Sequence, residues 1–351
     1  MGFRNCFKGY FKIFINRKKT MNKNHTFIIA ELSANHNNDL ELALRTIESV
    51  ATTGADAIKV QTYTADSLAI DVDNDFFGPK KEGLWKGIRP YDLYKEAALP
   101  YDWHQQLKEK AESLGLVFFS SPFDIEAVDF LEELQVPMYK IASFEITDIP
   151  LIRYTASKNK PMIISTGVAD LNDIELAVNA CKEVGNNDIT LLKCTSQYPA
   201  LLEDANLITI PEIQKRFNVK VGLSDHTMGD IVPVTAVALG ATIVEKHYIL
   251  DRSLGGPDST FSMEPHEFTE MVNKIREVEK TLGVVKFSIN DSDRYKRRSL
   301  FAIKDIEKGD LFSHENVRSL RPGVGLHPKQ LDVIIGEVST KNFRKGDPIN
   351  L

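Results

Sequence analysis

The segment from Val219 to Phe261 contains two polar motifs, Gly222-Leu223-Ser224-Asp225-His226 and Val244-Glu245-Lys246-His247, followed by Gly255-Gly256-Pro257-Asp258. Each polar motif ends a short β-like run, and the apolar residues 231–239 between them have helical spacing that stops at a glycine. A strand, a helix and a second strand in this order form parallel neighbours whose C-terminal ends lie side by side. The segment therefore predicts a β-α-β unit with polar residues gathered at one end.

Two histidines occupy corresponding places at these strand ends. Because side chains alternate along a strand, Ser224 and His226 face the same way, as do Glu245 and His247. Two imidazoles at adjacent strand tips suit a borderline divalent metal such as Mn²⁺, with water or substrate completing the coordination. The alternative is two unrelated histidines at loop starts, one of them an ordinary hydrogen-bond partner.

The same alternation of strands and helices runs through the preceding residues. Strands are predicted at 27–32, 57–61, 116–121, 138–143, 162–166 and 189–194, and helices at 39–53, 103–114, 125–134, 150–157, 171–184 and 265–282. With the pair in the opening segment this makes eight strands, each followed by a helix, which is the count of a TIM (β/α)₈ barrel. A doubly wound open sheet is the alternative, but no glycine-rich fingerprint follows the first strand.

The connection from residue 63 to residue 100 is unusually long for a compact domain. It contains Trp85, Tyr91 and Tyr94. Long connections are usually functional or disordered, and the aromatic residues favour an ordered lid.

The chain divides into four predicted segments. They are a basic, aromatic extension at 1–25, the barrel at 26–283, a linker at 284–298 and a small β-rich module at 299–351 with apolar runs at 300–303 and 333–336. The extension is either a helix that lies on a membrane surface or a stretch before a true start at Met21, which would not be native. The module is too small to bury much core alone, so we expect it to dock on the barrel or on a second chain.

Composition limits the functional classes. A net charge of −6 argues against nucleic acid as the main partner, and no apolar window is long enough for stable membrane insertion. The three cysteines have no metal-type spacing and are too few for a disulfide framework, which predicts a reducing compartment, the cytoplasm.

Chemically capable residues stand at nearly every strand end, where TIM barrels carry their active sites. They are Glu31, Lys59, Gln61, Ser121, Lys140, Ser143, Glu145, Ser165, Ser196 and Tyr198, besides Ser224 and the histidines. A single lysine within a strand usually extends its charged end to solvent. Two lysines inside apolar strands, with several hydroxyls at the same end, instead indicate a binding site for an anion such as phosphate. Glu31 and Glu145 are candidates for proton transfer or for stabilising a cation.

These residues carry a resemblance to a known family. The matching motifs are 29–31 with Asn35 and His36, 58–62, 121–123, 139–145, 165–167, 222–227, 245–247 and 256–258, and residues 321–328 resemble the family's antifreeze-like (SAF) domain. Together they resemble the sialic acid synthase family, whose members condense phosphoenolpyruvate with an acylamino sugar to a nine-carbon 2-keto acid. Residues 84–97 with Trp103 and His104 resemble its pseudaminic acid synthase branch.

The resemblance implies a role for each matching residue. It makes His226 and His247 the metal ligands, with Mn²⁺ expected and Mg²⁺ or Co²⁺ as substitutes. It makes Lys59, Ser121, Lys140, Ser143, Ser165 and Ser224 the phosphoenolpyruvate contacts, with Gln61, Ser196 and Tyr198 beside them; many sialic acid synthases carry asparagine at the position of Ser196. Glu31 would offset positive charge at C2, Glu145 would pass a proton to the sugar oxygen, and Asp258 would bind sugar hydroxyls or metal-bound water.

The resemblance also implies a domain-swapped homodimer. Arg321 matches an arginine that the antifreeze-like domain presents to the partner's barrel, where it contacts the sugar's acylamino group. The alternative is a surface arginine beside a turn.

Three other functions are alternatives for this residue pattern. An N-acetylneuraminate or legionaminate synthase differs only in the sugar. A different phosphoenolpyruvate-condensing barrel would need further basic residues for a phosphorylated sugar, and none stand at the strand tips. A non-catalytic carbohydrate-binding protein has no use for a complete set of strand-tip polar residues.

Overall fold

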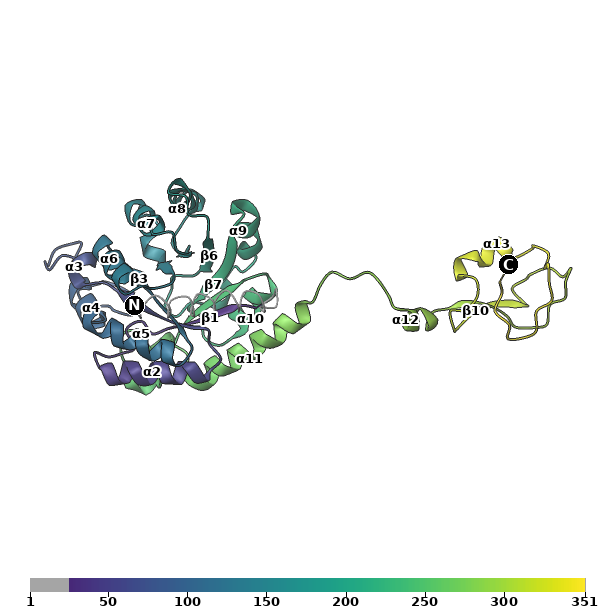
Figure 1. The fold of residues 1–351 in the computed structure, drawn as a ribbon, viewed down its shortest axis with the longest axis horizontal. Helices are drawn as coiled ribbons and strands as arrows, with labels where there is room; N and C mark the ends of the chain where they lie inside the picture. Colours follow the sequence, from purple (N-terminus) through teal and green to yellow (C-terminus); the bar gives the residue numbers. More distant parts are fainter. Residues whose placement is uncertain (1–24, 351) are drawn as a thin grey trace, which may run out of the picture. The chain divides into compact units, whose positions relative to one another are not determined.

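A computed structural model describes residues 25–350 of the chain, so the predictions for 1–20 lie outside the described residues. Eight parallel strands close into one barrel in chain order, because β8 pairs back onto β1. The strands are β1 Phe27–Glu31, β2 Ala57–Thr62, β3 Val117–Pro122, β4 Tyr139–Ile141, β5 Met162–Ser165, β6 Ile189–Cys194, β7 Lys220–Asp225 and β8 Ile243–His247. The predicted TIM barrel is confirmed (Figure 1).

Helices surround this barrel. They are α2 Leu40–Thr52, α5 His104–Ser113, α6 Ile125–Glu133, α7 Ile149–Ser157, α8 Leu171–Glu183, α9 Thr209–Phe217, α10 Ile231–Ala238 and α11 Pro265–Leu282. In α2 the side chain of Asp39 accepts hydrogen bonds from the first turn, and Leu42, Ile47 and Val50 form its buried face. The sequence predicted a helix after the sixth strand without locating it, and α9 is that helix.

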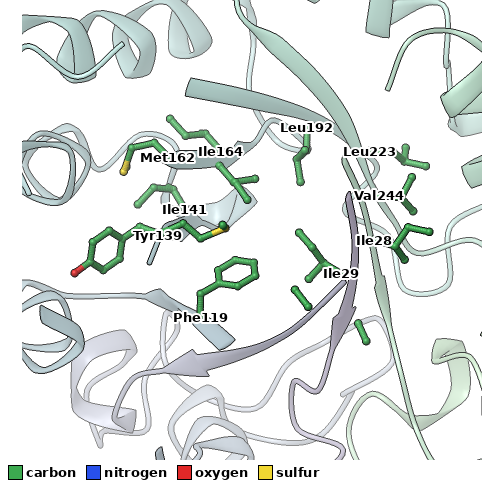
Figure 2. Packing of buried hydrophobic residues seen from close by; sticks show 14 of the residues in the cluster. Ile28, Ile29, Phe119, Tyr139, Ile141, Met162, Ile164, Leu192, Leu223 and Val244 are labelled. Atoms are coloured by element: carbon green, nitrogen blue, oxygen red, sulfur yellow. The ribbon is translucent and has the colours of Figure 1, made fainter. Parts of the chain in front are cut away.

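The barrel strands bury apolar residues on both faces. Ile29, Phe119 and Leu192 are buried apolar residues on these strands (Figure 2). Each stands two positions before a strand-end residue at the pocket (Glu31, Ser121 or Cys194), which by alternation places it inside the barrel. Gly222 belongs to the same inner layer. A Cβ there would stand 2.6 Å from Leu192 Cδ2 and 2.5 Å from the backbone oxygen of Ile243, so this position has no room for a side chain.

A buried ion pair joins the outward faces of β7 and β8. Lys246 Nζ donates to Asp225 Oδ2 and, at 2.5 Å, to the backbone oxygen of Thr227. Asp225 also accepts from the backbone N–H and the hydroxyl of Thr227. Both charged side chains are almost fully buried, so the pair is stable only while each partner is present.

The long connection after β2 is ordered, as the sequence predicted. It contains α3 Ala65–Leu68 and α4 Pro90–Ala97. Trp85 Nε1 donates to the backbone oxygen of Pro257 at 3.2 Å, so this segment is tied to the loop that follows β8.

A second compact unit begins at Val284. It contains α12 Asp291–Tyr295, the antiparallel pair β9 Ser299–Ala302 and β10 Val317–Leu320, and α13 Leu331–Ile334, and its core includes Leu300, Phe312 and Phe343. The β-like run predicted at 333–336 is wrong, because its first two residues end α13. Ile334 is buried while Val333 is exposed, and one helical turn achieves this as well as a strand does.

Among the described residues, the helices are all too short or too polar to cross a bilayer.

We predict that replacing Lys246 with Met lowers the free energy of unfolding of the barrel by about 3–5 kcal/mol, because Asp225 is left as an unpaired buried charge. Urea unfolding followed by tryptophan fluorescence measures this effect, since Trp85 and Trp103 both lie in the barrel unit. The control is Lys220→Met, which removes an exposed ion pair with Asp188 and should cost less than about 1 kcal/mol. Equal losses in the two variants would contradict the prediction.

Candidate active site

A pocket lies at the C-terminal ends of the barrel strands. Its lining contains ten of the predicted site residues: Glu31, Lys59, Gln61, Lys140, Ser143, Ser165, Tyr198, Ser224, His226 and His247. Ala142, Cys194 and Glu245 complete the lining. The strand register brings these residues together, because Glu31 pairs with Lys59 on one side and with His247 on the other.

Two buried lysines form the basic part of the pocket. Lys59 Nζ lies 2.6 Å from Glu31 Oε2 and donates to Ser121 Oγ at 3.2 Å. Lys140 Nζ donates to Ser165 Oγ at 2.7 Å. Burial lowers the pKa of Lys140, whereas for Lys59 the attraction of Glu245 and Glu31 outweighs burial and raises the pKa. The two ammonium groups and nearby hydroxyls form the arrangement that binds a phosphate or carboxylate.

Glu31 stands beside this basic part of the pocket. Gln61 Nε2 donates to Glu31 Oε1 and to Ser33 Oγ, each at 3.0 Å. Burial raises the pKa of Glu31, and the nearby Lys59 opposes that rise. The carboxyl group is thus fixed in orientation by an amide and an ammonium group.

Glu145 lies one turn beyond β4. The strand predicted at 138–143 ends at Ile141, and residues Ser143–Glu145 form a single 3₁₀ turn. The Oε2 atom of Glu145 is buried without a hydrogen-bond partner. Burial raises the pKa of Glu145 to about 7, although Lys140 opposes the rise. A carboxyl group with this pKa can both donate and accept a proton near neutral pH.

The two histidines lie next to each other at adjacent strand tips, as the sequence predicted. Their ring centroids are 5.2 Å apart. His226 Nδ1 lies 2.9 Å from the backbone oxygen of Thr195, and donation there leaves Nε2 free. His247 Nδ1 is buried without a hydrogen-bond partner and stands 3.8 Å from Asp258 Oδ2. Burial keeps the pKa of His247 well below its ordinary value, so this imidazole is neutral.

These donors fit a divalent metal held by two imidazoles. An unpartnered buried nitrogen on His247 and a free nitrogen on His226 are the donor types that Mn²⁺ accepts. Across residues 25–350 no three His, Cys, Asp or Glu side chains are placed to bind an ion together. The remaining ligands would therefore come from water or substrate.

Five predicted residues lie outside the pocket lining. Ser121 contacts Lys59, and Asp258 accepts from Ser33 Oγ at 2.5 Å. Glu145 and Ser196 also lie outside the lining. Ser196 Oγ is 3.8 Å from Cys194 Sγ. A Cβ on Gly167 would come within 2.2 Å of Ser196 Oγ. Arg321 belongs to the second unit.

Sequence reasoning missed two pocket residues. Glu245 is buried and accepts from Ser224 Oγ at 3.3 Å. The sequence placed it on the same face of its strand as His247 but assigned it no role. Cys194 ends β6 with its sulfur 3.9 Å from His226 Nδ1. Burial raises its pKa, but the contact with His226 prevails and lowers that pKa to about 7.

Comparison with known proteins agrees with this fold. The model of the NeuB family matches residues 46–287, and that of the SAF domain matches residues 297–351. A pseudaminic acid synthase of Campylobacter jejuni is 47% identical over 326 residues, which cover 92% of this chain and 95% of that protein. An N,N'-diacetyllegionaminic acid synthase of Legionella pneumophila is 38% identical over 328 residues, covering 91% and 92%.

A solved structure shows the same relationship. The N-acetylneuraminic acid synthetase from Leptospira borgpetersenii serovar Hardjo-bovis, in complex with citrate, has a TM-score of 0.69 and 36% sequence identity. The match covers 77% of this chain and 90% of that one.

A closed (β/α)₈ barrel with two buried lysines and two neighbouring histidines in a pocket at its strand tips defines the class, a barrel enzyme with an appended β module. The chain belongs to the NeuB family, and its C-terminal residues form a SAF domain. The resemblance to the sialic acid synthases is thereby confirmed.

We predict that Glu145→Gln stabilises the protein increasingly as pH rises from 4.5 to 7. The folded-state pKa of Glu145 is raised above its ordinary value near 4.5 to about 7, so ionisation disfavours the folded state over this interval. Glutamine removes the penalty, which amounts to about 3 kcal/mol at neutral pH. Urea unfolding of both proteins at pH 5 and pH 7.5 measures it. A stability difference that is equal at the two pH values would contradict the prediction.

Proposed function

We propose that the chain is a pseudaminic acid synthase, which condenses phosphoenolpyruvate with 2,4-diacetamido-2,4,6-trideoxy-L-altrose and water to give pseudaminic acid and phosphate. The main support is the 47% identity to a synthase of that name over nearly the full length of both chains. The pocket adds a chemical reason, because its buried lysines and hydroxyls suit a substrate with a phosphate and a carboxylate. An N-acetylneuraminate or legionaminate synthase is the alternative, with a different sugar in the same pocket.

The anionic substrate would lie on the basic part of the pocket. Lys59 and Lys140 neutralise its charge, and the hydroxyls of Ser121, Ser143, Ser165 and Ser224 donate hydrogen bonds to the remaining phosphate and carboxylate oxygens. Gln61, Ser196 and Tyr198 border this position. Substrate oxygens would then replace the hydrogen bonds that Lys140 and Ser165 now make with each other.

Carbon–carbon bond formation begins when C3 of phosphoenolpyruvate attacks the aldehyde carbon of the open-chain sugar. Positive charge develops at C2, and the Glu31 carboxylate, held by Gln61 and Lys59, offsets it. Glu145 donates a proton to the new sugar alkoxide. Water adds at C2, the bond between C2 and the phosphate oxygen breaks, and phosphate leaves as the 2-keto group forms.

His226 and His247 would hold the divalent metal, most readily Mn²⁺ with Mg²⁺ or Co²⁺ as substitutes, and Asp258 would bind sugar hydroxyls or water beside them. Such an ion supplies Lewis-acid polarisation of the sugar aldehyde.

The enzyme is proposed to act in the cytoplasm as a domain-swapped homodimer, in which Arg321 of one subunit completes the barrel site of the other. Arg321 would contact the sugar's acylamino group. The support is the SAF match at residues 297–351.

Phosphate release from phosphoenolpyruvate with Mn²⁺ tests the proposed function. We expect turnover with 2,4-diacetamido-2,4,6-trideoxy-L-altrose and little with N-acetylmannosamine, because a 6-deoxy, doubly acetamidated sugar offers a methyl group and an extra amide in place of hydroxyls. Preference for N-acetylmannosamine would instead identify a general sialic acid synthase. No phosphate release with any acylamino sugar would revive the non-catalytic alternative.

Mixing two inactive chains tests the shared active site. Glu31→Gln should lower kcat by a factor of about 10² or more with KM for phosphoenolpyruvate little changed. Hybrid dimers of Glu31→Gln and Arg321→Ala chains contain one intact site, so co-expression of equal amounts should restore about a quarter of the wild-type activity. Mixed chains that stay as inactive as the separate variants would refute a site completed in trans.

A further inference from the structure

Glu245 is a buried carboxylate at which the basic residues of the pocket converge. Its Oε1 atom lies 3.8 Å from Lys59 Nζ, 3.7 Å from Lys140 Nζ and 3.3 Å from Ser224 Oγ. These three residues come from three different strands, β2, β4 and β7. Glu245 takes no part in the proposed chemistry, although its side chain is only 6% exposed.

The charges in this part of the pocket balance. Lys59 and Lys140 contribute two positive charges, and the carboxylates of Glu31 and Glu245 contribute the two negative charges that compensate them. Without Glu245, two buried ammonium groups would share a single nearby carboxylate, and buried charges are stable only when they are paired. Glu245 therefore supplies the negative charge beside Lys59 and Lys140 that a bound anion would otherwise supply.

The second oxygen of Glu245 has no hydrogen-bond partner. A carboxylate that merely stabilised the fold would be expected to satisfy both oxygens with protein donors, as Asp225 does on the outer face of the barrel. The free oxygen instead belongs to a residue that lines the pocket.

We propose that Glu245 is a resident counter-ion of the anion pocket: it holds Lys59 and Lys140 aligned in the absence of substrate and then competes with the bound anion. This inference rests on the proposed function, since it takes that anion to be phosphoenolpyruvate or its product phosphate. A dianion that replaces Glu245 as partner of the lysines remains close to a like charge, and like charges in a low-dielectric pocket repel strongly. Glu245 thereby limits the affinity for phosphate and speeds its release.

Glu245→Gln tests the proposal, because it keeps the size of the side chain and an acceptor for Ser224 but removes the charge. Isothermal titration of the full chain with inorganic phosphate, and separately with phosphoenolpyruvate, needs no sugar and is done at one fixed metal content. We expect Glu245→Gln to bind both anions about tenfold more tightly. In turnover we expect lower KM for phosphoenolpyruvate, lower kcat and stronger inhibition by phosphate.

Two control variants separate charge from structure. Glu245→Asp keeps the charge and should bind phosphate within about threefold of the wild type. Glu132→Gln removes a part-buried carboxylate that contacts Tyr139 and Lys160 away from the pocket, and should leave anion binding unchanged. A loss of fold alone would weaken binding, so tighter binding in Glu245→Gln cannot arise from damage to the barrel.

Each outcome decides the matter. Equal or weaker binding by folded Glu245→Gln, with normal wild-type binding, overturns this inference and leaves the proposed function standing. Wild-type protein that binds neither anion overturns both. If Glu245→Gln folds only in phosphate, the anion has replaced the carboxylate, which supports the proposal; a variant that stays unfolded in saturating phosphate contradicts it.

Discussion

The alternation of side chains along eight strands in a closed barrel is the constraint on which this structure depends. Each inward position shares one narrow interior with positions from the other strands, so residues far apart in the chain become neighbours at the strand tips. Glu31, Lys59 and His247 meet through register alone. Because the interior excludes water, the charges there must be paired with one another or with substrate, and this requirement links the stability of the barrel to its chemistry.

The strands β7 and β8 show how the same two strands contribute both to the stability of the barrel and to the pocket. Their inward residues are Ser224, Glu245 and the two histidines, while their outward residues form the buried pair of Asp225 and Lys246. The outward pair is fully satisfied and fixes the strand ends, whereas several inward polar atoms are unsatisfied. Unsatisfied buried groups on a rigid support are the expected property of a site that awaits a ligand.

The loops after the strands add a second layer to the site. Asp258, on the loop after β8, is held by Ser33 from the loop after β1, and Trp85 contacts Pro257 next to it. The ordered segment 63–100 is thus tied to the residues nearest His247. Side chains on loops that are fixed in this way are preorganised, which favours discrimination between similar ligands.

The sequence by itself determined the barrel, its eight strands and most of the pocket, because strand periodicity and strand-end position are local properties of the chain. It could not locate the end of β4 or the helix α13, since short apolar runs fit either a strand or a helical turn. The place of Glu245 between two lysines was decided only by tertiary structure. Distances between side chains on three separate strands depend on barrel closure and register, which no local pattern contains.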